Sequence, residues 1–273
     1  MTGELVRDAP EAYYARWALS NSGMGELLRC PARLKALLDR AGERDADTPA
    51  MLTGRLLHCM VLEPEALAAR WRRKNFSGTT KEGRAESAAA RADGVTLVPA
   101  PTWDDCEAMR AALMTHPAIG NARHRETEVS VYWEERDGLV PCKARVDMLA
   151  EIPGFGPVAI DLKTTCDASP RELERGLLRF GYARQAAWYL RGLRAAGRDV
   201  RAFVFVAVEK TAPHVVTAYT VSADARERAL RDIERCVETF AQCTARGQWP
   251  GYTESPIVEL DLPAWAYRQE EDD

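Results

Sequence analysis

The sequence predicts an α/β protein in which a mixed β-sheet is flanked by helices and preceded by a helical N-terminal portion. Two observations support this fold class. Apolar residues recur at helical spacing through the first third of the chain. After residue 125, short alternating or fully apolar runs are separated by turn residues and by two helical stretches. Strands and helices that follow one another in this way are typical of a sheet covered by helices.

The N-terminal portion, residues 1–120, is expected to contain several helices. Leucines between 27 and 38 lie at helical spacing, and Pro31 ends one short helix and begins the next. A second helix is expected over 49–73, split by Pro64. Residues 75–99 are polar and basic, and we expect a mobile helix–loop there. Another helix is expected over 101–116.

Strands are expected in the second half of the chain, over residues 128–133, 140–150, 158–163, 201–208 and 215–221. A Pro-Gly turn at 153–157 connects the second strand to the third. Helices are expected near 170–178, 182–196 and 224–246. We expect one domain over 1–273, with a helical portion (1–120), an α/β core (121–252) and an acidic tail (253–273). The sequence leaves the strand order open.

The composition excludes several classes of protein. The chain has 273 residues, of which 46% are hydrophobic and 29% charged, so it is neither disordered nor collagen-like. No run of 18 apolar residues and no apolar leader is present, so neither a membrane span nor a secretion signal is expected. The seven cysteines are scattered and form no C-x-x-C pair, which argues against a disulfide framework or a zinc ribbon. We expect a reduced, cytoplasmic protein.

Positive charge gathers in two stretches of an acidic chain whose net charge is −4. Residues 70–91 hold seven basic and two acidic side chains, and residues 171–210 hold nine basic and four acidic ones. Such stretches suggest contact with an anion such as a phosphate backbone. On charge alone, solvated helix faces are the simpler interpretation.

The most informative residues are Asp147, Asp161 and Lys163. Alternation along a strand points Asp161 and Lys163 to the same side. If strands 140–150 and 158–163 pair as a hairpin, Asp147 approaches Asp161, and two adjacent carboxylates are stable mainly with a proton or a divalent cation between them. Oxygen ligands suit Mg²⁺ or Mn²⁺. A metal, carboxylates and a lysine are what phosphodiester hydrolysis needs.

A surface ion pair between Asp161 and Lys163 is the alternative interpretation, and D-x-K triplets are common on solvated faces. This interpretation is weakened by the sequence before the triplet. Val158, Ala159 and Ile160 indicate a buried strand, in which a charged residue needs a partner.

The motif order resembles the PD-(D/E)xK nuclease superfamily, in its RecB-like and especially RecE-like branch (the exodeoxyribonuclease VIII type). Five elements carry the resemblance, which spans about residues 13–252. They are Leu19–Gly23 with Cys30-Pro31-Ala32, the G-x-x-L-H element Gly54–His58, Arg145-Val146-Asp147, Asp161-Leu162-Lys163-Thr164-Thr165, and Gly181–Tyr189. The chain has Val146 where many members have proline, which leaves the carboxylate intact.

The resemblance implies roles for individual residues. Asp147, Asp161, the Leu162 carbonyl and His58 would hold Mg²⁺, with Mn²⁺ able to substitute, and Lys163 would orient water and steady the phosphate. Gln185 and Tyr189, one helical turn apart, would hold the DNA strand or buttress the site, and a packing role for them is equally open. Glu128 could be an additional acid. The residues expected to contact DNA are Arg73, Lys74, Lys81, Thr164, Thr165, Tyr182 and Arg184.

The resemblance also implies an activity. We expect a Mg²⁺-dependent exonuclease that digests linear duplex DNA from 5′ to 3′, leaving a 3′ overhang for a single-strand annealing protein in phage-type homologous recombination. A homo-oligomeric ring around the DNA could make the enzyme processive, because the chain has no Walker A motif for ATP-driven movement. The chain also lacks the four-cysteine arrangement that holds an iron–sulfur cluster in some RecB-like nucleases. A single-strand exonuclease, a structure-specific endonuclease and a non-catalytic DNA-binding module remain alternatives.

Overall fold

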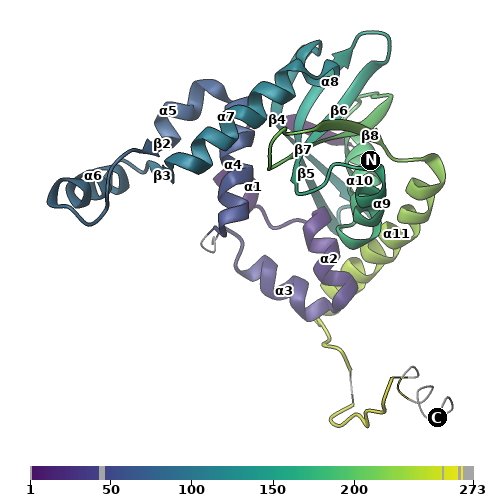
Figure 1. Ribbon diagram of the computed structural model, residues 1–273. Coiled ribbons are helices and arrows are strands. Elements are labelled where there is room, and N and C mark those ends of the chain that lie inside the picture. The colour runs from purple at the N-terminus through teal and green to yellow at the C-terminus, as the bar shows by residue number, and fades with distance from the viewer. Residues whose placement is uncertain (1, 43–46, 254, 264–265, 267–273) are drawn as a thin grey trace, which may run out of the picture.

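The computed structural model describes residues 2–42, 47–253, 255–263 and 266. A six-stranded sheet with the order β1-β4-β5-β6-β7-β8 forms its centre (Figure 1). The strands are β1 (Gly3–Val6), β4 (Arg123–Glu135), β5 (Val140–Ile152), β6 (Gly156–Thr165), β7 (Ala202–Glu209) and β8 (Val216–Thr220). Neighbours pair antiparallel except β6 and β7, which are parallel. The predicted mixed sheet flanked by helices is therefore confirmed.

Two apolar cores lie on the two faces of the sheet. One contains buried residues of the sheet, α2 (Asn21–Arg29), α3 (Pro31–Asp39), α10 (Tyr182–Ala195) and α11 (Ala223–Arg246). The other contains α4 (Pro49–Leu62), α7 (Ala100–Thr115) and α8 (Pro117–Gly120). The short α9 (Pro170–Arg179) precedes α10 and packs against it. The two helical layers account for the apolar spacing that predicted these helices.

Pro31 and Pro64 act as the sequence indicated. Pro31 is the first residue of α3, directly after α2 ends, and the Ser20 side chain caps α2 by accepting from the Gly23 amide. The helix expected over 49–73 is interrupted at Pro64. It continues as a 3₁₀ turn (Pro64–Ala66), the short α5 (Leu67–Arg70) and then the strand β2 (Trp71–Lys74).

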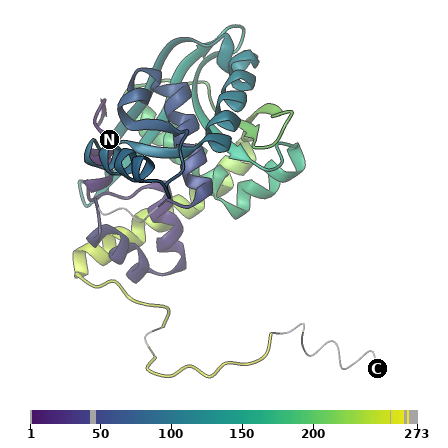
Figure 2. The same ribbon diagram turned by 60° about the vertical axis from the view of Figure 1, so that its left-hand side comes forward.

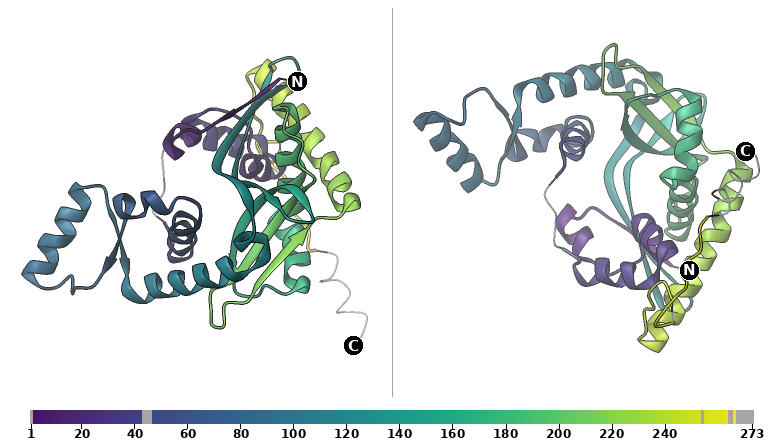
Figure 3. Two further views of the ribbon diagram at one scale, coloured as in Figure 1. Left: turned by 90° about the horizontal axis from the view of Figure 1, so that it is seen from above. Right: turned by 60° about the horizontal axis from the view of Figure 1, so that its bottom comes forward.

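The helix expected within residues 75–99 is present, but the residues after it form a strand where a loop was expected. Residues 81–92 form α6 (Lys81–Ala92), and β3 (Thr96–Pro99) pairs in parallel with β2. Trp71 and Val98 anchor this unit in the second core. We call β2, α6 and β3 the arm. It projects from the body of the molecule in Figures 1 and 3.

The N-terminus also departs from the expectation. β1, which the sequence analysis did not predict, adds an edge strand to the sheet by pairing with β4, and α1 (Pro10–Ala15) follows it. Of the acidic tail at 253–273, residues 254, 264–265 and 267–273 lie outside the described part, and they include the four acidic residues Glu270–Asp273. Within the described part, no helix is long and apolar enough to cross a membrane.

A fork between β5 and β6 fixes the position of the site. Their pairing runs from Ile152–Gly156 to Met148–Ile160 and then stops. Beyond this point β5 pairs with β4 alone, and β6 pairs with β7 alone. The next residues on the two separating strands are Asp147 and Asp161. The predicted hairpin is therefore present, and the two aspartates lie where it opens.

Candidate active site

Asp147 bridges the fork through the backbone of β6. Its carboxylate accepts a hydrogen bond of 2.8 Å from the Leu162 amide, which has no β5 partner there. Buried backbone donors need such partners. The Leu162 carbonyl, on the other side of the same residue, lies 3.1 Å from His58 Nε2. At the fork, the side chains of Asp147 and His58 therefore bind the unpaired backbone amide and the carbonyl of Leu162. All three are residues that the sequence predicted for the site.

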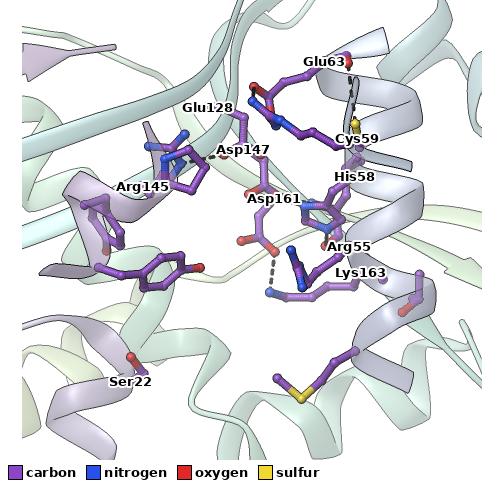
Figure 4. A pocket seen from close by; sticks show the side chains of 18 of the residues that line it. Ser22, Arg55, His58, Cys59, Glu63, Glu128, Arg145, Asp147, Asp161 and Lys163 are labelled. Atoms are coloured by element: carbon purple, nitrogen blue, oxygen red, sulfur yellow. Dashed lines mark hydrogen bonds and ion pairs between the residues drawn. The ribbon is translucent and has the colours of Figure 1, made fainter. Parts of the chain in front are cut away.

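Asp161 and Lys163 lie on one face of β6, as strand alternation predicted. The Lys163 ammonium is 2.5 Å from an Asp161 oxygen, and the Asp161 side chain is buried. Its other oxygen accepts a hydrogen bond from the Gln185 side-chain amide on α10. Figure 4 shows Lys163 and Asp161 pointing toward one another in the cavity. The alternative interpretation, a surface ion pair between Asp161 and Lys163, is therefore wrong, because this pair is largely buried.

His58 lies on α4 and reaches the fork from the face of the sheet opposite to α10, which carries Gln185. Its Nδ1 is 3.6 Å from an Asp147 oxygen. One turn earlier on the helix, Gly54 faces β6, and a side chain there would meet the Thr164 hydroxyl at 3.7 Å. The G-x-x-L-H element therefore places a small residue and a histidine against the strand that carries Asp161 and Lys163.

Glu128 lies opposite Asp147 on β4, between the pairs Thr127–Met148 and Val129–Val146. Its backbone has φ +52°, a left-handed conformation that is strained for glutamate. Arg145 fixes its carboxylate through an ion pair of 2.6 Å. Arg145 also contacts the Asp8 carboxylate at 3.1 Å. The arginine of the R-x-D motif thus holds an acidic side chain beside Asp147, a role that the sequence analysis did not predict.

The donor set fits a divalent ion. One ligand atom each from His58, Glu128 and Asp147 can be chosen so that all three lie within 4.8 Å of one another. A nitrogen and carboxylate oxygens at this spacing suit Mg²⁺ or Mn²⁺. Asp161 is the next carboxylate across the fork. Glu128, which the sequence offered only as an additional acid, therefore joins the candidate metal ligands more directly than Asp161 does.

When no metal is bound, the electrostatics of the fork raise the proton affinity of Asp147 and keep Lys163 charged. Burial and the neighbouring Asp161 raise the pKa of Asp147, although His58 opposes this shift. Burial lowers the pKa of Lys163, but Asp161 and Asp147 outweigh it and the net pKa is raised. Lys163 therefore stays an ammonium near neutral pH, which suits charge neutralisation and not proton abstraction.

Tyr182 and Tyr189 fall on either side of this centre. The Lys163 ammonium lies 5.2 Å from the centre of the Tyr182 ring, which itself packs on Phe205. Tyr189 lines the same cavity and packs edge-on against Phe203 at 5.3 Å. Both tyrosines therefore support the site by packing, and Tyr189 also contributes to the cavity wall.

The residues expected to contact DNA are divided between the cavity and other places. Thr164 lines the cavity, whereas the Thr165 hydroxyl accepts from the Asp167 amide in the turn after β6. Arg184 is half-buried and donates to the Asn21 side chain and carbonyl, so it connects α10 to α2. Lys74, Lys81 and Arg73 lie on the arm, where Arg73 is paired with Asp104 at 2.8 Å.

The cavity around the fork has a volume of about 770 Å³ and includes residues that the sequence analysis missed. Tyr13 and Tyr14 of α1, Arg55 of α4, Trp71 of the arm and Lys210 line it together with the predicted residues. These side chains come from distant segments and carry no shared local pattern. A register argument could have placed Glu128 near Asp147, because facing residues on antiparallel strands are neighbours.

Similarity to known proteins agrees with this geometry. A family model described as "PDDEXK-like domain of unknown function (DUF3799)" matches residues 20–257. A crystal structure from Eubacterium rectale, titled "Putative exonuclease", has a TM-score of 0.62 at 13% identity, covering 96% of this chain and 98% of that one. The structure of SSO0001 covers 69% of this chain and 86% of that one, at 16% identity and a TM-score of 0.31. No curated protein matches the sequence.

A forked mixed sheet that carries D…D-x-K at its opening is typical of a PD-(D/E)xK domain. This class of domain supports the assignment of the chain as a nuclease. The chain belongs to the family of PDDEXK-like domains whose model covers residues 20–257. The superfamily resemblance seen in the motifs is thus confirmed.

Proposed function

We propose that the protein is a Mg²⁺-dependent DNA exonuclease that hydrolyses linear duplex DNA from its ends, 5′ to 3′, in the manner of RecE-like enzymes. The convergence of Asp147, Asp161 and Lys163 at the fork, with His58 facing them, carries this proposal. The similar Eubacterium rectale structure, described as a "Putative exonuclease", supports the same activity class. A 3′ overhang would pass to a single-strand annealing protein.

The proposed chemistry divides among the residues of the fork. His58, Glu128, Asp147 and Asp161 would hold the ion, which supplies positive charge at the scissile phosphate and acidifies water. Lys163 would neutralise charge that develops on the phosphate, because its ammonium is held at the cavity wall by Asp161. Gln185 would keep Asp161 in place by donating to the oxygen that Lys163 does not contact.

The position and the charge of the arm support a role for it in holding the duplex. Its strand β2 begins at Trp71, which lines the active-site cavity, and its basic side chains follow along β2 and α6. Among the described residues, Lys74 and Lys81 have no carboxylate partner within ion-pair distance, whereas Arg73 is held by Asp104. We expect Lys74 and Lys81 to contact phosphates, and Arg73 to orient the arm.

A cleavage assay with end-labelled DNA tests the proposal. Wild-type protein, Asp161→Asn and Glu126→Gln are incubated with Mg²⁺ and a linear duplex labelled at its 5′ or 3′ ends, the same DNA as a closed circle, and a single strand. Glu126→Gln is the control because it also removes one carboxylate charge from a sheet strand, and Glu126 pairs with Arg198 outside the site. We expect wild-type protein and Glu126→Gln to release nucleotides from the 5′ ends of the linear duplex and from neither of the other substrates. Asp161→Asn is expected to release none.

Other outcomes assign the alternatives. Cleavage of the closed circle would make the protein an endonuclease, and degradation of the single strand alone would make it a single-strand exonuclease. No cleavage with either Mg²⁺ or Mn²⁺ would contradict the proposed activity and leave a DNA-binding module.

A further inference from the structure

Asp8 lies before the first of the sequence motifs, yet the fold places it in line with the acidic residues of the fork. β1 pairs with β4 as far as Val6 and Ser130, and β5 pairs with β6 as far as Met148 and Ile160. Continuing these registers by one or two positions, together with the β4–β5 register, gives one row across four strands: Asp8, Glu128, Asp147 and Asp161. Asp8 is therefore the outer end of the row that contains the candidate metal ligands.

The segment that carries Asp8 is held on both sides. Before Asp8, β1 pairs with β4 at the edge of the sheet, where Figures 2 and 3 show the purple N-terminal segment. After Asp8, the buried Lys143 ammonium donates to the carbonyls of Tyr13 at 2.9 Å and Arg16 at 2.6 Å, at the C-terminal end of α1. Carbonyls at a helix C-terminus lack helical partners and favour a cation. These contacts fix the position of Asp8.

The Asp8 carboxylate is held in an ionised state. Its Oδ1 accepts a hydrogen bond of 2.5 Å from the Ser130 hydroxyl, and its Oδ2 accepts from the Tyr132 hydroxyl. Burial raises the pKa of Asp8, but these hydroxyls and Arg145 outweigh burial, and the pKa is lowered. Asp8 therefore presents a negative charge to Arg145.

The Arg145 guanidinium joins Asp8 to Glu128. Its Nε is 2.6 Å from Oε2 of Glu128, and its Nη1 lies 3.1 Å from the Asp8 carboxylate and 3.0 Å from the Ser130 hydroxyl. Figure 4 shows Arg145 beside Glu128. In the described part of the chain, no other basic side chain lies within ion-pair distance of either carboxylate. Because the donors of a guanidinium are fixed in one plane, anchoring Nη1 sets the direction from which Nε reaches Glu128.

This anchoring matters because Arg145 competes with a metal ion for Glu128. A guanidinium that is released from Asp8 can turn and bind both oxygens of a carboxylate, which is its preferred geometry. Glu128 also has a strained backbone, φ +52°, and such strain persists only where the surrounding contacts hold the residue. Both effects make the geometry of Glu128 depend on the partner that holds Arg145 from behind.

We propose that Asp8 is a positioning residue for the candidate metal centre. By holding Arg145, it keeps the Glu128 carboxylate beside Asp147 in the direction that a divalent ion requires. Asp8 itself does not contact the ion. This inference rests on the metal-dependent function proposed above, and it makes the N-terminal segment, residues 3–16, a part of the active site.

The Mn²⁺ affinity of the full-length protein, measured by calorimetry or electron paramagnetic resonance, tests the role of Asp8. Asp8→Asn is expected to weaken Mn²⁺ binding by about tenfold. Glu4→Gln is the control, because it removes a carboxylate from the same segment, where Glu4 pairs with the exposed Arg16 at 3.5 Å. Glu4→Gln should bind Mn²⁺ as the wild type does. Each variant is assayed below its unfolding temperature.

Two further variants separate positioning from charge and from a general structural role. Ser130→Ala with Tyr132→Phe leaves every charge in place and releases Asp8 from its hydroxyl donors, so Mn²⁺ binding should weaken, by less than in Asp8→Asn. If Asp8 acts through Glu128, adding Asp8→Asn to Glu128→Gln should change the affinity by less than about twofold.

The outcomes distinguish this inference from the proposed function. Equal Mn²⁺ affinities of Asp8→Asn and the wild type would overturn the inference alone. Losses that add fully in the double variant would also overturn it, because Asp8 would then act independently of Glu128. A wild-type protein that binds no Mn²⁺ would contradict the metal-dependent function and, with it, the role of Asp8.

Discussion

The amide of Leu162 donates to the Asp147 carboxylate across the fork, just beyond the point where β5 stops pairing with β6. The hydrogen bond has two consequences. It satisfies a strand amide that would otherwise be unpaired, and it fixes one oxygen of Asp147 so that the carboxylate faces His58. The separation of β5 from β6 thus creates the space for the site. It also leaves free the Leu162 amide that orients the Asp147 carboxylate.

Replacing Glu128 by glutamine is expected to weaken divalent-ion binding by about tenfold or more, because the change removes a charged ligand that Arg145 holds beside Asp147. Calorimetry or electron paramagnetic resonance with Mn²⁺ measures this affinity without relying on catalysis. Glu126→Gln on the same strand should bind Mn²⁺ as the wild type does. Equal affinities in the two variants would remove Glu128 from the ligand set.

Metal affinity is expected to rise with pH through the titration of Asp147. Burial and Asp161 raise the pKa of Asp147 to about 7, against the opposing effect of His58. A folded-state pKa above the unfolded value stabilises the metal-free protein at low pH, and this contribution is lost as the pH rises through about 7. A cation requires the deprotonated carboxylate, so its binding releases a proton.

Thermal unfolding with and without Mn²⁺, repeated from about pH 5.5 to about pH 8, measures this linkage. The increase in Tm caused by the ion should grow over that range in the wild type. Asp147→Asn should show a smaller increase that varies less with pH. A wild-type increase that is independent of pH would show that Asp147 does not release a proton to the ion.

Gly192→Ala on α10 is expected to destabilise the protein by about 1–3 kcal/mol, although alanine normally favours a helix over glycine. An added Cβ would lie 2.5 Å from the Trp133 ring. That ring is 3% exposed and packs against Trp188 with centroids 4.5 Å apart, so it has little room to move.

Urea unfolding measures the free-energy change. Gly251→Ala serves as the control, because no atom lies within 4 Å of a Cβ at that position. An increase in stability for Gly192→Ala would show that Trp133 can shift, and that this contact does not set the distance between α10 and the sheet.

Much of the fold followed from local patterns in the sequence. Alternation in β6 placed Asp161 and Lys163 on one face, and the Pro-Gly turn correctly joined β5 to β6. The strand β1 was missed because four residues give too short a pattern, and its position depends on pairing with β4 more than 120 residues later. The strands of the arm were missed because β2 consists mostly of basic residues.

The candidate site was only partly predictable for the same reason. The motif residues Asp147, Asp161, Lys163 and His58 meet as expected from the sequence. The contact of Arg145 with Asp8 joins residues 137 positions apart, and no local signal marks it. The sequence offered Glu128 as an additional acid, but its strained backbone, φ +52°, and its ion pair with Arg145 are not indicated by a strand pattern.

The most direct test of the central claim is the release of nucleotides from a linear duplex by wild-type protein and Lys163→Met in Mg²⁺. Methionine keeps the side-chain volume and removes the ammonium that Asp161 holds at the cavity. We expect release by the wild type and a loss of about a hundredfold or more in the variant. The assay is run below the unfolding temperature of the variant, which is expected to fall because the buried Asp161 carboxylate loses its partner. Release at the wild-type rate by Lys163→Met would contradict the assignment of the fork as the hydrolytic site.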